Sequence, residues 1–313
     1  MNTGLTDSHG ILLRRSAIER GIDDDALKRL VRGGLLVRIR QGAYADAAIW
    51  AQANATHRHR LLTRAVLALY GDHVALSHAS ATVAYGGPDW GLDLRDVHVT
   101  HLDGRAQRSA GRVVHHRGEC RVDDISRLEE WWITSPARTA LDTAAAAPRD
   151  SAVCVLDWYL EQQLVTRDQL LMGHARMSRW PDTLGLYRAI HLADGKAQSV
   201  LETRTRLLCH DSRLPAPEAQ FIVMGPLGEI IGIVDFAWPE RKVMVEVDGR
   251  EKYLKFRRPG ESIEDAVLRE KVREDRLRES TGWLVVRLSW ADIEHRPQAA
   301  VARIERAFRR AAA

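Results

Sequence analysis

Cysteine is scarce in this sequence of 313 residues, which holds three of them. They lie far apart, at Cys120, Cys154 and Cys209. An odd number at such distances argues against a disulfide framework, and no two of them have the spacing of a metal-ligand motif. Reduced thiols are typical of the cytoplasm, where we expect this protein to be located.

Long apolar runs are also absent. No stretch reaches the roughly 18 apolar residues of a membrane span, and the N-terminus lacks the layout of a signal peptide, so neither a membrane partner nor export is expected. We find no repeat of roughly 20 to 50 residues and no low-complexity segment beyond the alanine run at 144–147. The length allows two or three globular domains.

Charge is nearly balanced, because 46 basic residues face 42 acidic ones. The net charge of +4 and the pI of about 9.1 favour an acidic partner such as nucleic acid, although only weakly. The distribution of the basic residues must therefore decide whether the protein binds nucleic acid.

The first region, residues 7–45, has the pattern of a winged helix. Ser8 is placed to cap a helix that would carry the apolar residues 11–13. Asp23 is placed to cap a further helix over residues 24–32, whose apolar positions have helical spacing. Such a helix could enter a groove of double-stranded DNA, which is the expected partner.

Residues 35–44 follow that helix, alternate apolar with basic residues and turn at a glycine, as a β-wing would. The helix and the wing together predict exposed basic side chains that grip phosphates. The alternatives are charges that only keep the protein soluble, or a winged helix that contacts another protein. The basic residues are Lys28, Arg29, Arg32, Arg38 and Arg40.

Residues 57–148 predict a small α/β unit with strands near 97–100, 113–116 and 131–134. Five histidines fall in this region: His78, His98, His101, His115 and His116. None has a ligand spacing with a carboxylate, so we expect solvated or core roles for them. Ser77 and His78 are not expected to act as a nucleophile pair, because adjacent side chains on a strand or helix point in different directions.

The most informative stretch is residues 230–249, which predicts two apolar strands joined by a Trp-Pro turn. Side chains alternate along a strand, so Met244, Glu246 and Asp248 share one face of the second strand. Asp235 lies in the first strand, and pairing of the two strands would place it beside Glu246. Like charges that are buried together raise each other's pKa, and a divalent cation resolves that conflict.

Oxygen ligands of this kind suit Mg²⁺ or Mn²⁺, the cofactor that we expect. The alternative is a structural ion network without a metal. The basic residues that could form this network are Arg206, Lys252, Arg273 and Arg276.

This arrangement resembles the core of the PD-(D/E)XK nuclease superfamily, in which an acidic helix residue precedes the acidic strands. Here that residue would be Glu202, in the helix-like run 199–208. Residues 196–295 more narrowly resemble uncharacterised domains related to very short patch repair endonucleases. The narrower resemblance rests on Glu202, 217–220, 234–236, 245–249, Lys252, 273–276 and 282–287.

One departure from that family lies at Asp248, which stands where the superfamily has its usual lysine, two positions after the acid. Lys252 could bring its ammonium group back to the same place. The resemblance thus implies metal ligands at Glu202, Asp235 and Glu246. It implies a catalytic set of Glu202, Asp235, Glu246, Asp248 and Lys252.

Residues 7–148 resemble the antitoxin of the abortive-infection AbiE system in the order of segments 35–44, 76–81 and 133–142. In that family the winged helix binds operator DNA and represses transcription. The resemblance implies an N-terminal DNA-reading module, with a toxin or a second copy of the chain as further partners.

Together these patterns predict an α+β multidomain protein. The expected domains are a winged helix at 1–55, a small α/β domain at 56–148, a helical linker at 149–195 and a PD-(D/E)XK-like domain with a mixed central sheet at 196–313. The expected function is that of a DNA-binding protein with a metal-dependent endonuclease domain that hydrolyses phosphodiester bonds. The alternative is a transcriptional regulator or antitoxin-type repressor with a catalytically silent nuclease-like domain.

Overall fold

The computed structural model describes residues 4–102, 111–117, 120–177, 183–225, 227–248 and 262–312. The chain is an α+β protein with mixed and antiparallel sheets, as expected. It divides into two compact units. The first comprises Met1–Tyr159 and Gln163–Ile190, and the second comprises Leu160–Gln162 and His191–Ala313. The division into four domains stays a prediction.

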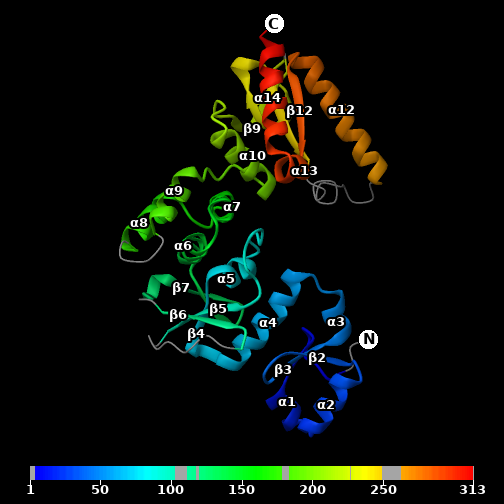
Figure 1. Cartoon of the computed structure of the whole chain (residues 1–313), viewed down its shortest axis with the longest axis vertical. Helices are drawn as coiled ribbons and strands as arrows, with labels where there is room; N and C mark the ends of the chain where they lie inside the picture. Colours follow the sequence, from blue (N-terminus) through cyan, green and yellow to red (C-terminus); the bar gives the residue numbers. More distant parts are fainter. Residues whose placement is uncertain are drawn as a thin grey trace. The chain divides into compact units, whose positions relative to one another are not determined.

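The first unit begins with a three-stranded antiparallel sheet of order β1-β3-β2. Its elements, blue in Figure 1, are β1 (Ile11–Leu13), α1 (Arg14–Glu19), α2 (Asp24–Arg32), β2 (Leu36–Arg40), β3 (Ala43–Asp46) and α3 (Ala47–Gln52). The predicted cap of α2 is confirmed, because the Asp23 side chain accepts a hydrogen bond from the Ala26 N–H.

The helix expected over residues 11–13 is wrong, since these residues form β1. All three of its side chains are buried. A helix would turn part of such a run towards solvent. Pairing of Leu12 with Tyr44 of β3 instead holds the segment extended.

A five-stranded mixed sheet of order β6-β5-β4-β8-β7 follows. Its elements are α4 (Ala55–Tyr70), β4 (Val74–Leu76), α5 (His78–Tyr85), β5 (Val97–His101), β6 (Val113–His116), β7 (Ile125–Leu128) and β8 (Trp131–Thr134). Leu62 and Val66 of α4 share one core with Val97, Val99 and Val113 of the sheet. Because side chains alternate along a strand, the residues between these valines face the other side of the sheet.

A run of helices follows this sheet, and its part within residues 149–195 is helical as expected. The run contains α6 (Pro136–Ala146), α7 (Arg149–Glu161), α8 (Arg167–Arg176) and α9 (Thr183–Leu192). Ser135 and Pro136 begin α6, with proline in the first turn, where a missing N–H leaves no hydrogen bond unmade.

The second unit is built on a four-stranded sheet of order β12-β11-β10-β9. β9, β10 and β11 run antiparallel, whereas β11 and β12 run parallel. The elements are α10 (Val200–Asp211), β9 (Glu218–Met224), β10 (Ile230–Trp238), β11 (Val243–Asp248), α12 (Ile263–Thr281), β12 (Leu284–Ser289), α13 (Trp290–His295) and α14 (Pro297–Ala311).

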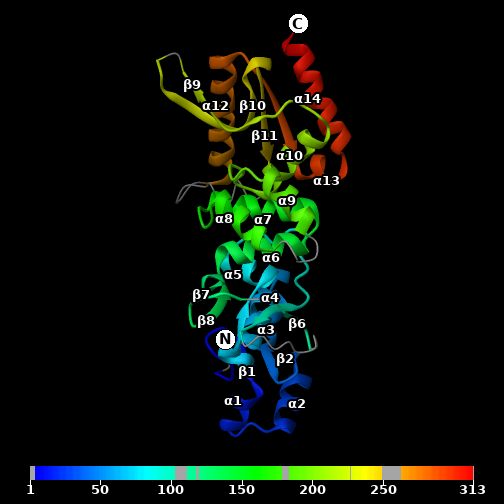
Figure 2. The same cartoon turned by 90° about the vertical axis from the view of Figure 1, so that its left-hand side faces the viewer.

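Each face of this sheet has its own core. Val243, Val245 and Val247 of β11 pack with Ile304 of α14 on one face. Met244 belongs to the core that holds Leu277 of α12. Figure 2 shows α12 and α14 on opposite sides of the strands. The predicted alternation of β11 is therefore confirmed. Among the described residues, no helix is long and apolar enough to cross a membrane.

Candidate functional site

Two of the predicted metal ligands lie on neighbouring strands of the second unit. β10 and β11 pair with Phe236 opposite Val245, and the same register places Asp235 opposite Glu246. Both residues are buried, with 7% and 6% of their surface exposed. Two buried carboxylates on adjacent strands require an offsetting positive charge or hydrogen-bond donors.

Both acids have such partners. Oδ2 of Asp235 accepts a hydrogen bond from the Val247 N–H over 2.7 Å. Glu246 forms an ion pair with Arg273 of α12, and Nε of Arg287 lies 3.9 Å from its second oxygen. Arg287 is also the residue opposite Glu246 in the parallel pairing of β11 and β12. The ion pair that the sequence offered as an alternative is thus confirmed for Glu246 and Arg273.

The third acid, Glu202, lies in the first turn of α10 and is 2% exposed. Its N–H donates to Ser199 Oγ over 3.2 Å, while Ser199 Oγ donates to Oε1 over 2.9 Å. The Gln198 N–H and Gln220 Nε2 each donate to Oε2 over 2.9 Å. Ser199 therefore caps α10, and Glu202 holds this cap and ties the helix to β9.

Gln220 connects Glu202 to the acidic strands. The β9–β10 register on both sides of it places Gln220 opposite Asp235. Its backbone φ of 50° is uncommon for a residue other than glycine. Gln220, Asp235 and Glu246 thus follow one another across β9, β10 and β11, and Glu202 of α10 is hydrogen-bonded to Gln220. We call these four residues the acidic row.

The acidic row is not a closed ligand set. In the part of the chain that the structure describes, one set of three His, Cys, Asp or Glu side chains brings its ligand atoms within 4.8 Å of one another, and it consists of histidines. An ion held by Glu202, Asp235 and Glu246 would require their oxygens to draw closer. Asp248 ends β11 and is half-buried, while Lys252 lies outside the described residues.

The predicted DNA-binding residues lie on α2 and β2 of the first unit. Lys28, Arg29, Arg32 and Arg38 are exposed, as expected. Lys28 Nζ lies 2.9 Å from Asp25 Oδ1, but a pair this exposed is weak and leaves the charge accessible. These four residues form the cationic face.

The expectation that all five basic residues are exposed is wrong for Arg40, which is half-buried. Its guanidinium carbon lies 5.7 Å from the centre of the Tyr70 ring of α4. The β2–β3 register shifts between Arg38 and Arg40, which breaks the simple alternation that the sequence implied. We therefore exclude Arg40 from the cationic face.

No protein-family model matches the chain. Two uncharacterized proteins of Mycobacterium tuberculosis, MT2308 and Rv2248, are each 30% identical to it over 287 residues. The match covers 90% of this chain and 95% of each relative. This chain belongs to their family. The family therefore extends across both units described above.

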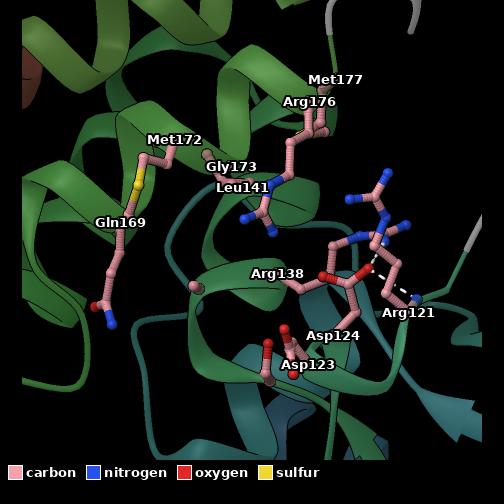
Figure 3. Close-up of a pocket in the computed structure, with 12 residues that line it drawn as sticks. Arg121, Asp123, Asp124, Arg138, Leu141, Gln169, Met172, Gly173, Arg176 and Met177 are labelled. Carbon is pink, nitrogen blue, oxygen red and sulfur yellow. Dashed lines mark hydrogen bonds and ion pairs between the residues drawn. The ribbon is translucent and has the colours of Figure 1, made fainter.

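A pocket of about 220 Å³ lies in the first unit between α6, α8 and the segment before β7. Figure 3 shows Arg138 beside Asp124, with Arg176 extending from α8 into the same space. Arg138 Nη1 lies 3.1 Å from Asp124 Oδ2, and Arg138 Nε donates to both oxygens of Asp142 over 2.9 Å. Burial raises the pKa of Asp142 to about 6, and Arg138 counteracts part of that shift.

The side chains of Ser77 and His78 are in contact next to Asp142, although the sequence predicted that they point in different directions. Ser77 Oγ lies 3.1 Å from His78 Nδ1 although the two residues are adjacent. The argument from alternating directions fails because His78 has a φ of 52°, outside both regular conformations. His78 Nδ1 also lies 4.0 Å from Asp142 Oδ2.

The histidines on β5 and β6 meet in two pairs, which spacing along the sequence did not reveal. His98 Nδ1 lies 2.8 Å from His116 Nε2, and His101 Nε2 lies 2.8 Å from His115 Nδ1. The ring of His78 stacks on that of His116 with the centroids 3.5 Å apart. A usable signal was the alternation itself, because two consecutive histidines at the end of a strand must face opposite sides of the sheet.

Proposed function

We propose that this protein binds double-stranded DNA and that its second unit is a PD-(D/E)XK-like, metal-dependent endonuclease. The observation that carries the proposal is the pair of buried acids, Asp235 and Glu246, at opposite positions when the register of the adjacent strands β10 and β11 is continued by one residue. Glu202, on the helix before those strands, is tied to the same row through Gln220. This is the order of acidic positions that the resemblance implies.

The carboxylate oxygens of Asp235 and Glu246 have the chemistry that Mg²⁺ or Mn²⁺ prefers, and these two residues would hold the ion with Glu202 nearby. When bound, such an ion lowers the pKa of a water molecule and offsets charge on the phosphate. Phosphodiester hydrolysis requires a barrier reduction of roughly 20 kcal/mol. A carboxylate base alone supplies roughly 10²- to 10⁴-fold, which is far too little.

The remaining contacts position these groups. The Val247 N–H fixes one oxygen of Asp235, and the cap at Ser199 fixes the carboxylate of Glu202. Arg287, whose side chain is 41% exposed beside Glu246, is placed to contact a phosphate of the substrate. Asp248 would orient the site, and Lys252 would neutralise developing charge.

For the first unit, we propose that the cationic face is the recognition helix and wing of a winged helix-turn-helix. α2 is a capped helix with three exposed bases, and Arg38 is exposed on the adjacent β2–β3 hairpin. These charges suit the phosphates that flank a major groove. The proposal agrees with the antitoxin resemblance of this region.

One observation favours a second candidate, a DNA-binding regulator or antitoxin-type repressor with a silent nuclease-like unit. Glu246 already has cationic neighbours in Arg273 and Arg287, so its charge is offset without a metal. In this alternative the acidic row only stabilises the unit.

The experiment that separates the two candidates is nicking of supercoiled plasmid in Mg²⁺ by the wild type and by Asp235→Asn. The asparagine keeps an acceptor for the Val247 N–H but removes the charge. We expect the variant to lose at least about 10³-fold in rate. Glu218→Gln is the matched control, because Glu218 is an exposed acid on β9 of the same sheet, and it should retain the wild-type rate.

Equal and negligible nicking by the wild type and Asp235→Asn, with DNA binding intact in a gel-shift assay, would favour the regulator. If neither the wild type nor Asp235→Asn binds DNA in the gel-shift assay, the result would count against the nuclease and the regulator alike. Circular dichroism of each variant establishes that a lost rate does not reflect unfolding.

A further inference from the structure

The first unit contains a cluster of three imidazoles, His78, His98 and His116, which we call the histidine cluster. Their ligand nitrogens all lie within 4.8 Å of one another. The rings are stacked, with centroid separations of 3.5 Å for His78 and His116 and 5.1 Å for His98 and His116. The three side chains come from the start of α5 and from β5 and β6, so only the folded chain brings them together.

The sheet explains why these histidines meet. β5 and β6 pair in parallel with Val97 opposite Val113, whose side chains face α4. His98 and His116 lie at alternate positions and face the other side, where α5 begins. His101 and His115 remain on the α4 side, and His115 Nε2 lies 3.3 Å from the Tyr70 hydroxyl of that helix.

The two closest ring nitrogens of the histidine cluster, His98 Nδ1 and His116 Nε2, require a proton or a cation between them. Two neutral ring nitrogens at 2.8 Å repel unless one carries a proton that the other accepts, or unless a cation lies between them. Burial holds the pKa of His116 at about 4 and lowers the pKa of His98 and His78 as well. A metal binds the neutral form of an imidazole, through a ring nitrogen that carries no proton.

The surroundings of His78 have the pattern of a second coordination shell. Its Nδ1 faces Ser77 Oγ at 3.1 Å and Asp142 Oδ2 at 4.0 Å, and Arg138 holds that carboxylate in place. Acceptors behind one ring nitrogen fix the tautomer and direct the other nitrogen towards a metal. The left-handed backbone of His78 is a further sign, because strain at a residue other than glycine concentrates at functional sites.

We propose that His78, His98 and His116 together bind one zinc-class divalent ion through their ring nitrogens, with a water molecule completing the coordination. Three neutral imidazoles suit Zn²⁺ or Co²⁺, whereas Mg²⁺ prefers oxygen ligands. Tetrahedral bonds of about 2.0 to 2.1 Å separate ligand nitrogens by roughly 3.3 to 3.4 Å. The 2.8 Å pair would open by about half an ångström, and the stacked rings of His78 and His116 would turn so that the in-plane lone pairs of their nitrogens converge on the ion.

This site is independent of the acidic row, which belongs to the other unit and would hold a harder ion. A three-histidine ion with one open position has the composition of catalytic rather than closed structural zinc sites. The ligand expected at the open position is a small oxygen donor such as water or hydroxide.

The test uses the full-length chain with its affinity tag removed, because a histidine tag would bind the same metals. After treatment with a chelator, isothermal titration with Zn²⁺ should give one site per chain with a dissociation constant below about 1 µM. Substitution with Co²⁺ should give the intense visible absorption of a tetrahedral ion. His116→Gln should weaken binding at least about 100-fold, because one of three protein ligands is lost.

Two further variants make the outcome decisive. Asp142→Asn leaves all three ligands in place and should weaken binding by about 10- to 100-fold. His101→Gln removes a buried histidine from the opposite face of the same sheet, and Asp235→Asn changes the acidic row. Both should keep the wild-type stoichiometry and affinity for Zn²⁺.

Failure of the folded wild-type chain to bind Zn²⁺ or Co²⁺ would overturn the proposal even if His116→Gln did not fold. Equal Zn²⁺ affinity of the wild type and His116→Gln would overturn it as well. In either case the histidine cluster is a hydrogen-bonded polar network. Plasmid nicking is not part of this test, so its result does not depend on the proposed nuclease.

Discussion

The acidic row and the histidine cluster both gather titratable side chains on neighbouring strands, but they avoid buried charge in opposite ways. In the acidic row, Glu246 has the cationic side chains of Arg273 and Arg287 beside it. In the histidine cluster, burial keeps the rings neutral, and the pKa of His116 falls to about 4. A carboxylate near pH 7 needs a cation, whereas an imidazole can lose its proton. Any ion at the acidic row must therefore compete with arginines, while an ion at the histidine cluster would replace only a shared proton.

The largest effect on stability is expected from Arg273→Met, which removes the cation beside Glu246 and keeps most of the side-chain volume. A buried carboxylate that loses its partner destabilises a fold by about 3 to 5 kcal/mol. We expect the lower end, about 3 kcal/mol, because the Arg273 side chain is 29% exposed. Urea unfolding without divalent ions measures this change.

Arg276→Met is the matched control for Arg273→Met. Arg276 is exposed on the same helix, so its loss should change stability by less than about 0.5 kcal/mol. If the acidic row binds Mg²⁺, the ion should stabilise Arg273→Met more than the wild type, since it offsets the same charge. Equal stabilisation of the two proteins would count against a metal at Glu246.

A pH effect of about 3 kcal/mol is expected at His59, a buried histidine beside the cluster. Burial lowers its folded-state pKa from 6.5 to about 4, and the ring contacts Leu94 O and Ser80 Oγ. Below pH 6.5 the unfolded chain therefore binds a proton that the folded chain does not, and stability is lost as the pH falls towards 4. The loss is about 3 kcal/mol at pH 4.

Comparison of the wild type with His59→Gln isolates this effect. The variant lacks the titrating group, so its deficit relative to the wild type should shrink as the pH is lowered from 7.5 to 4. Unfolding free energies at a series of pH values provide the measurement. Parallel pH curves for the two proteins would show that His59 titrates normally in the folded chain.

The smallest effect is expected from Arg38→Ala, and it is an effect on DNA binding. This variant tests whether the first unit contacts DNA. Loss of one phosphate contact should reduce the slope of log affinity against log salt by about one and lower affinity less than about tenfold. Arg20→Ala is the control, because Arg20 is an exposed arginine that is not part of the cationic face and donates hydrogen bonds to Leu5 O and Gly4 O. An unchanged slope in Arg38→Ala would remove Arg38 from the proposed interface.

Local patterns predicted much of this fold. The alternation of β11 and the cap at Asp23 each depend on residues within one element. β1 could not be predicted in this way, because three apolar residues become a strand only through pairing with β3, more than thirty positions later. Sequence-based prediction is weakest where a distant partner decides the conformation.

In the candidate sites too, features set by local sequence were predicted and features set by distant contacts were not. The register of β10 and β11, continued by one residue, brings Asp235 and Glu246 to opposite positions as predicted, since the turn between the two strands is short. The contacts of Gln220 and His78 escaped prediction because the positive φ angles of these residues depend on the surrounding structure. The meeting of His98 and His116 depends on the parallel register of β5 and β6, which no local signal determines.

The central claim is that Asp235 and Glu246 hold a divalent ion for phosphodiester hydrolysis. Its most direct test is the initial rate of plasmid nicking as Mg²⁺ is raised from zero, measured for the wild type beside Asp235→Asn. The account predicts a saturable rate that requires Mg²⁺ in the wild type and is lost in Asp235→Asn. A wild-type rate that is absent at every Mg²⁺ and Mn²⁺ concentration, or one that Asp235→Asn retains, would contradict it.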